Sequence, residues 1–425
     1  MKHLKFRNGA IDVGRLNREG LYIAPARNIP IFNGALVLTR REYRLLQGVN
    51  LTIARSLQRA AEYALERLPA LVAAACSHDS KKLLLVRADP CTKLPWSVMA
   101  RLDTVWEGGW PRMLEYNSGM VEGWSYIHLI QQACYGEVHR RPWLLAEALP
   151  SPIPLVWGAF LQVFKERFGQ SKVPVTAVLF RSDDPVKSVE APVFAKTIRD
   201  WGYTVVLASP EELELRGREA WVRGKRVNLI FKCFGTRDCP ESVERICLHP
   251  LDYDCVALPH TRQTVMGLKF TMAILSDPQF ESLFALGDVG TLRRTVPWTR
   301  IVAEDRTTDP EGLPCNLVDY TVASRDCLVI KESSGSSGKM VYLGWQTSQE
   351  EWEALVERAL TEESWVVQKK VTLPRSSFDG EIASWDCDPY YFLGSVGPIV
   401  NRFSDADILN VFQGGALCPV MRRIY

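Results

Sequence analysis

Alternation of apolar and polar residues along the chain is most regular between positions 101 and 117. It runs on both sides of Gly108-Gly109, which is typical of two strands joined by a tight turn. We expect the turn to be centred on Gly109, with a three-residue loop of Gly108, Gly109 and Trp110. The stretch therefore predicts a β-hairpin with one defined register.

Four polar side chains share one face of this predicted hairpin. In the expected register Asp103 lies opposite Glu115. Arg101 lies opposite Asn117, and the period of two along a strand brings all four side chains to the same face. Two carboxylates that face each other repel. Mg²⁺ takes oxygen ligands from Asp, Glu and Asn and would offset that repulsion, and Arg101 beside it suits a phosphate. A solvated face with an ordinary Arg–Asp pair is the alternative.

Apolar periodicity predicts further elements elsewhere. Helices are expected over residues 41–75 (interrupted near Pro69), 119–135, 155–168, 189–201, 267–275 and 349–360. Strands are expected over 83–87, 173–180, 203–208, 227–234, 327–331, 341–343 and 365–371, with a small hairpin over 221–227 and a strand-like tail from 390. Residues 1–40 give no clear element. The helix expected from 119 starts directly after Asn117, so its N-terminal amides would lie near the predicted cation and anion site.

The strand–helix–strand pattern after residue 173 implies a parallel sheet. We therefore divide the chain into four parts. These are a helical N-terminal segment (1–80), a segment with the magnesium-binding strand pair and helices (81–172), a substrate-facing α/β domain (173–262) and a nucleotide-binding region (263–425).

Composition narrows the classes of partner. Hydrophobic residues make up 47% of the chain, enough for large buried cores. The net charge of +2 gives no electrostatic case for nucleic acid or membrane binding. No apolar run approaches the roughly 18 residues that span a bilayer, and the first residues lack the apolar core of a signal peptide, so we expect a cytoplasmic protein. Eleven cysteines without a Cys-x-x-Cys pair are typical of reduced, buried thiols.

A second group of candidate residues surrounds the Gly/Ser-rich loop at residues 333–338. Small residues let backbone amides approach phosphate oxygens, although a flexible surface turn is the alternative. The loop is not a P-loop, because Met340 follows Lys339 and a strand follows where a helix would be needed. Lys331 ends an apolar strand, where a charge is costly to bury without an anion. The strand at 365–371 turns polar at its end and can pair with an adenine edge.

In this order, the Arg-x-Asp strand, the Glu-x-Asn strand, a helical lysine, a lysine before a Gly/Ser loop, a Val-Val-Gln segment and a late arginine resemble the circularly permuted ATP-grasp ligases. The resemblance is strongest to the synthetase domain of glutathionylspermidine synthase and covers about residues 87–402. It implies an α/β (α+β) fold, the ATP-grasp fold in permuted order, with mixed sheets, a glycine-rich lid and an inserted parallel α/β domain. It does not extend to the residues that hold glutathione.

The resemblance also implies roles for individual residues. The magnesium ligands would be Asp103, Glu115 and Asn117, with Arg101 as the catalytic arginine that assists the transferring phosphoryl group. ATP would be bound by Lys269, Lys331, Ser334, Gly335, Gly338, Gln368, Lys370 and Arg402, and the adenine hinge would run from Gln368 to Val371.

The resulting hypothesis is an ATP-dependent carboxylate–amine ligase that uses ATP and Mg²⁺. A carboxylate would attack the γ-phosphate, and an amine from an amino acid, peptide or polyamine would then attack the acylphosphate, with release of ADP and phosphate. Three alternatives remain open: transfer to the thiol of a carrier protein, a kinase, and a non-catalytic nucleotide-binding protein.

Overall fold

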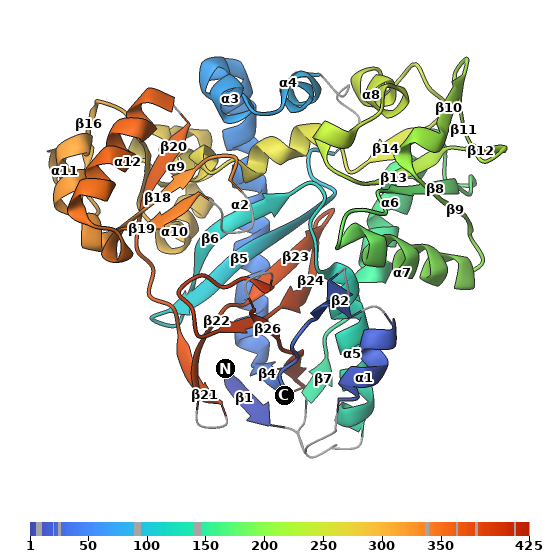
Figure 1. Cartoon of the computed structure of the whole chain (residues 1–425), viewed down its shortest axis with the longest axis horizontal. Coiled ribbons are helices and arrows are strands. Elements are labelled where there is room, and N and C mark those ends of the chain that lie inside the picture. Colours follow the sequence, from blue (N-terminus) through green and yellow to red (C-terminus); the bar gives the residue numbers. More distant parts are fainter. Residues whose placement is uncertain are drawn as a thin grey trace.

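The structure is a computed structural model, and it shows a mixed α/β fold with several sheets (Figure 1). It describes residues 1–5, 11–19, 21–23, 27–88, 95–139, 146–335, 340–362, 364–378, 381–411 and 414–424. No helix within these ranges is both long and apolar enough to cross a membrane.

A four-stranded antiparallel sheet occupies the centre, in the order β24-β23-β5-β6. Its strands are β5 (Met99–Glu107), β6 (Trp110–Ser118), β23 (Asp388–Phe392) and β24 (Ser395–Val400). Helix α2 (Arg40–Arg67) runs behind this sheet (Figure 1) and is followed by α3 (Pro69–Ala75), which confirms the predicted interruption near Pro69. Thr39 and Glu42 form a capping box that fixes the start of α2.

The hairpin at β5–β6 corrects the predicted turn. Glu107 pairs with Trp110, so the loop has two residues, Gly108 and Gly109, rather than three. Both glycines have positive φ, at 57° and 77°. A two-residue loop with positive φ at both positions matches the right-handed twist of the flanking strands, and glycine adopts that conformation without strain.

The register at the functional end of the hairpin is nevertheless the predicted one. Asp103 pairs with Glu115 and Arg101 with Asn117, because an irregularity in the ladder between Asp103 and Thr104 adds one residue to β6. Such a bulge shifts the register by one position. The shorter loop and the bulge cancel, so the predicted facing pairs are confirmed although the predicted loop is wrong.

A parallel sheet forms a second lobe, drawn in green on the right of Figure 1, in the order β14-β13-β8-β9. Its strands are β8 (Val175–Phe180), β9 (Thr204–Ala208), β13 (Leu229–Cys233) and β14 (Val256–Leu258), and α7 (Lys187–Asp200) connects β8 to β9. The predicted strand–helix–strand unit and its parallel pairing are confirmed. A meander of β10 (Leu213–Arg216), β11 (Glu219–Val222) and β12 (Lys225–Val227) precedes β13 and contains the predicted hairpin.

A third lobe lies on the left of Figure 1 and holds the predicted nucleotide elements. Its antiparallel sheet has the order β15-β20-β18-β19. The strands are β15 (Thr299–Ile301), β18 (Leu328–Glu332), β19 (Val341–Leu343) and β20 (Trp365–Lys369), and the flanking helices are α9 (Phe270–Ser276), α10 (Leu286–Thr295), α11 (Leu317–Ala323) and α12 (Gln349–Glu362).

The predictions for residues 1–40 and 83–87 need correction. Residues 1–40 contain β4 (Gly34–Leu38), which lies between β1 (Lys2–Lys5) and β27 (Val420–Arg423) in a sheet that ends with β7 (Ala146–Ala148). The predicted strand at 83–87 is part of helix α4 (Ser80–Arg87), which Asp79 caps by accepting a hydrogen bond from the Lys82 amide. A short apolar run does not distinguish a strand from a buried helical turn.

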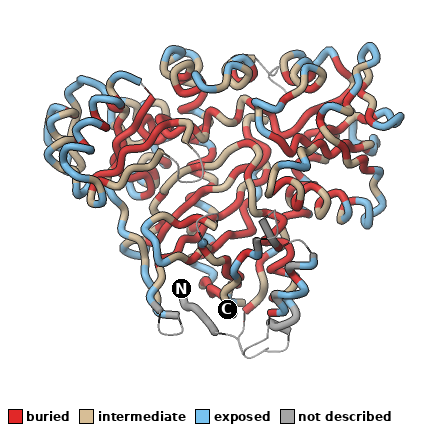
Figure 2. Tube along the Cα trace, in the orientation of Figure 1, coloured by how far each residue is buried: buried red, intermediate tan, exposed pale blue. Residues whose placement is uncertain are grey.

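The predicted helix at 119–135 is also displaced. Helix α5 spans Trp124–His139, so it does not begin directly after Asn117. The remaining elements are α1 (Val13–Glu19), α6 (Pro152–Phe168), α8 (Glu241–Leu248), β2 (Tyr22–Ile23), β3 (Arg27–Asn28), β16 (Arg306–Thr308), β17 (Pro314–Asn316), β21 (Arg375–Phe378), β22 (Glu381–Trp385), β25 (Arg402–Ser404) and β26 (Ala416–Leu417), together with short 3₁₀ turns that include η4 (Thr261–Gly267) and η7 (Gly344–Gln346). Figure 2 shows that the central and parallel sheets are buried.

Candidate functional site

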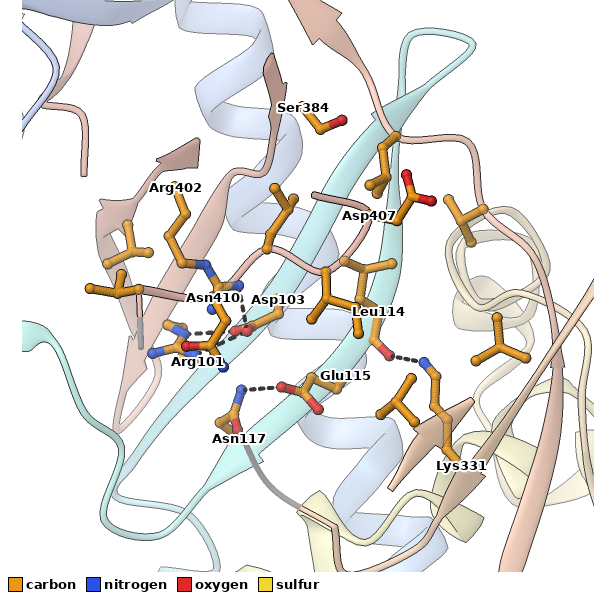
Figure 3. A pocket seen from close by; sticks show the side chains of 18 of the residues that line it. Arg101, Asp103, Leu114, Glu115, Asn117, Lys331, Ser384, Arg402, Asp407 and Asn410 are labelled. Carbon is orange, nitrogen blue, oxygen red and sulfur yellow. Dashed lines mark hydrogen bonds and ion pairs between the residues drawn. The ribbon is translucent and has the colours of Figure 1, made fainter. Parts of the chain in front are cut away.

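A pocket of about 520 Å³ opens between the central sheet and the β18–β20 sheet. Its lining includes all four residues predicted from the hairpin, Arg101, Asp103, Glu115 and Asn117 (Figure 3). Lys331, Gln368, Lys370 and Arg402 line the same pocket. The structure therefore brings together residues that are up to 301 positions apart in the sequence, from Arg101 to Arg402.

Asp103 is held between two arginines at the floor of this pocket. Oδ1 accepts a hydrogen bond from Nε of Arg101 at 2.6 Å, and Oδ2 accepts one from Arg402 at 2.8 Å. Burial raises the pKa of the Asp103 carboxyl, but the guanidinium groups of Arg101 and Arg402 outweigh it and lower the pKa to about 2. Asp103 is therefore ionised at neutral pH, and each of its oxygens accepts a hydrogen bond from a guanidinium.

Two carboxylates that sequence reasoning missed complete this buried cluster. Asp386 accepts hydrogen bonds from the backbone amide and from Nε of Arg402, at 2.6 and 2.5 Å. Asp388 accepts from Arg402 at 2.7 Å and from the Thr104 amide at 2.8 Å. Burial raises the pKa of the Asp388 carboxyl well above its usual range, and repulsion by the carboxylates of Asp103 and Asp386 raises it further. The Asp-x-Asp spacing directly before and within β23 is the sequence signal that points to them.

The repulsion between Asp103 and Glu115 is thus offset largely by basic side chains. Two arginines hold Asp103, and Nζ of Lys269 lies 3.8 Å from Oε2 of Glu115. Within the described ranges, no group of three or more His, Cys, Asp or Glu residues is arranged to hold a metal ion. Glu115, whose side chain is 34% exposed, and Asn117 fit the oxygen donors that Mg²⁺ prefers. The assignment of Asp103 as a ligand stays a prediction, since a cation there would compete with guanidinium groups.

Lys331 is a buried cation with neutral partners. Its Nζ donates to Oε1 of Gln368 at 2.6 Å and to the carbonyl of Leu114 at 3.2 Å. No carboxylate of the described residues lies within 4.0 Å of it. Burial lowers the pKa of the Lys331 ammonium to about 8, with Glu115 opposing and Lys269 adding to the shift. A buried ammonium without a charged partner favours the binding of an anion, which would supply the negative charge that the protein does not place there.

The other predicted nucleotide residues fall into two groups. Gln368 is buried and its amide donates to Thr299, while the ammonium of Lys370 lies 3.7 Å above the ring of Trp345. Lys269 precedes α9 and donates to the carbonyl of Gly335. The lining residues of the pocket do not include Lys269, Ser334 or Gly335 in the described part of the chain, and Gly338 lies outside the described residues.

Comparison with known proteins gives a fold but no family. No family model matches the chain, and no curated protein matches it. The structure resembles that of a glutathione synthetase-like effector from Globodera pallida, with a TM-score of 0.58, 9% identity, and coverage of 96% of this chain and 95% of the other. A putative gamma-glutamylcysteine synthetase from Methylobacillus flagellatus KT matches with a TM-score of 0.43 and 10% identity over 87% of this chain and 88% of the other, too low to bear on the fold. The first likeness shows a shared fold over almost the whole of both chains.

Proposed function

We propose that the protein is an ATP-dependent ligase of the ATP-grasp type, which joins a carboxylate to an amine and releases ADP and phosphate. The observation that carries the proposal is the pocket of about 520 Å³ between two sheets, which is lined by both the buried ammonium of Lys331 and the carboxylate of Glu115. The fold shared with a glutathione synthetase-like protein supports the same class of reaction.

Phosphoryl transfer needs positioning and charge neutralisation more than a protein nucleophile. Lys331 would bind a phosphate of ATP, and the segment from Gln368 to Val371 would lie along the adenine. Arg101 would stabilise the charge that develops as the substrate carboxylate attacks the γ-phosphate. Mg²⁺, held by Glu115 and Asn117 together with phosphate oxygens, would neutralise charge on the nucleotide. The order of the elements would be the circularly permuted one.

A screen for ADP release tests this proposal. Purified protein is incubated with ATP and Mg²⁺ over pairs drawn from amino acids, short peptides and polyamines, and each positive pair is analysed by mass spectrometry. We expect one product whose mass is that of the acid plus the amine minus water, with one ADP per product. The control is Lys196→Met, which removes an exposed lysine of α7, against Lys331→Met in the pocket.

The outcomes separate the proposal from its alternatives. Loss of ADP release in Lys331→Met but not in Lys196→Met supports the pocket as the nucleotide site. A stable phosphorylated product instead of a condensed one would identify a kinase and overturn the ligase. The absence of ADP release over the whole panel would also overturn it.

A further inference from the structure

A second charged cluster, formed by Lys187, Glu190 and Glu122, adjoins the same pocket, and Glu122 is the member that lines it. Lys187 is the first residue of α7 and is only 3% exposed. Its Nζ lies 3.2 Å from Oε1 of Glu122 and 3.3 Å from Oε2 of Glu190. Glu190 is fully buried and accepts hydrogen bonds from the Gly123 amide at 2.8 Å and the Ser125 hydroxyl at 3.3 Å. None of these contacts is used by the nucleotide site described above.

The cluster lies at the point where the order of the strands in the parallel sheet reverses. From β8 the chain passes through α7 to β9 on one side, whereas β13 pairs with β8 on the other side. In open α/β sheets, ligands bind outside the carboxyl ends of the strands at such a switch point. Lys187 follows the loop after β8, and Cys233 ends the neighbouring strand β13. Helix α5 packs against α7 there (Figure 1).

Glu122 connects this cluster to the nucleotide site. Its backbone carbonyl accepts hydrogen bonds from Nη1 of Arg101 at 2.9 Å and from the hydroxyl of Tyr390 at 2.8 Å. The next residue, Gly123, has a φ of +91°, and a Cβ on it would lie 3.0 Å from that hydroxyl. The chain is therefore held close to Arg101, and Glu122 lines the pocket together with Tyr126 and Val186.

Charge and exposure single out Glu122 within the cluster. Two carboxylates share one ammonium, and burial raises the pKa of the Glu190 carboxyl to about 7, so the cluster gains an excess of negative charge as Glu190 ionises around neutral pH. The Glu122 side chain is 41% exposed, against 4% for Lys187 and none for Glu190. Its Oε1 faces Lys187, and no hydrogen bond from the described residues reaches its Oε2. Glu122 is therefore the only member of the cluster that a molecule in the pocket can reach.

We propose that Glu122 binds a cationic amine group of the acceptor substrate, with Lys187 and Glu190 as positioning residues that hold its carboxylate at the pocket wall. This inference rests on the proposed function and deepens it, because it names the residue that recognises the amine. The site lies beside Arg101, at the end of the pocket where the activated carboxylate would be. Tyr126 and Val186 supply an apolar surface for the hydrocarbon part of the amine.

Direct binding tests the proposal without catalysis. The probes are putrescine, glycinamide and L-lysine, with 1,4-butanediol as the uncharged counterpart of putrescine, titrated calorimetrically into the full-length protein. At least one amine should bind, Glu122→Gln should weaken that binding tenfold or more, and butanediol should not bind. Glu122→Asp, which keeps the charge, should stay within about threefold of the wild type. The matched control is Glu166→Gln, which changes an exposed glutamate of α6.

Kinetics with an acceptor found by ADP release give the second readout. Glu122→Gln should raise KM for the amine tenfold or more and leave KM for ATP unchanged, a split that a general loss of folding would not produce. The inference is overturned if no amine binds at 10 mM, or if Glu122→Gln binds amines as the wild type does. Those results leave the ligase intact if ADP is still released, whereas absence of ADP release over all acid and amine pairs counts against the proposed function itself.

Discussion

The pH dependence of nucleotide binding should report directly on Lys331. Its ammonium is buried against two neutral acceptors, and burial lowers its pKa from the ordinary 10.5 to about 8. Since the pKa is lower in the folded than in the unfolded chain, the unfolded chain binds more protons between these values. Stability should therefore rise as the pH increases from about 8 to 10.5, by about 3 kcal/mol at ~1.4 kcal/mol per pH unit.

A phosphate at this site favours the charged form of Lys331, so the sign for binding is the opposite. As the pH rises above 8, a growing share of the protein must take up a proton before it binds ATP. The Kd for ATP should then rise up to tenfold per pH unit. Lys331→Arg keeps its charge throughout this range, so its Kd should stay nearly constant, although the larger side chain weakens binding at pH 7.

Isothermal titration of Mg-ATP at half-unit steps from pH 7.0 to 9.5 makes this measurement. The control is Lys196→Arg, which alters an exposed lysine that does not line the pocket and should follow the wild type. The reasoning fails if the Kd of the wild type is flat over this range, or if Lys331→Arg shows the same slope as the wild type. Either result would mean that no phosphate is bound by the Lys331 ammonium.

Three further changes test the geometry of the site. Glu115→Gln should abolish ADP release with less than about 1 kcal/mol change in the free energy of unfolding, because the side chain is partly exposed; unchanged turnover would exclude it as a ligand. Asp103→Asn should lower the free energy of unfolding by about 3–5 kcal/mol, because it removes one carboxylate from a buried cluster and leaves its two guanidiniums less well compensated. The measurement is a urea titration, and an unfolding midpoint equal to that of the wild type would contradict this. Gly267→Ala should lower Tm by several degrees, because a Cβ would lie 2.8 Å from the carbonyl of Tyr116 in β6; an unchanged Tm would show that β6 yields there.

The strand pair could be predicted from sequence because its information is local. The alternation of apolar and polar residues determines which side chains share a face of the hairpin. Asp103, Glu115 and Asn117 stay on the same face if the register shifts by two residues, but not if it shifts by one. The predicted loop is one residue longer than the observed loop, and the extra residue of the bulge in β6 restores the predicted pairing of Asp103 with Glu115. At the bulge the Thr104 amide donates a hydrogen bond to Asp388, which lies 284 residues later, and this contact has no signature in the hairpin itself.

The partners of Arg402 lie at very different distances along the chain. Asp388 and Asp386 lie only 14 and 16 residues before Arg402, whereas Asp103 lies 299 residues before it. Asp103 and Glu115 face one another as predicted, and Arg101 forms the Arg–Asp pair that the hairpin alone offers as the alternative to a metal ion. Arg402 and Lys269, which also lie against these two carboxylates, come from distant parts of the chain and have no signature in the hairpin.

The charges of the side chains that line the pocket also indicate when a cation would be needed. In the part of the chain that the structure describes, three basic residues of the pocket, Lys331, Lys370 and Arg375, have no carboxylate within 4.0 Å. The pocket can therefore accept an anion, but a triphosphate would still bring its charge next to Glu115. Mg²⁺ is commonly bound by one or two carboxylates together with substrate phosphates, rather than by a cage built from the protein alone. We therefore expect Glu115 and Asn117 to bind magnesium only as the nucleotide complex, so that magnesium without ATP should leave the Tm unchanged.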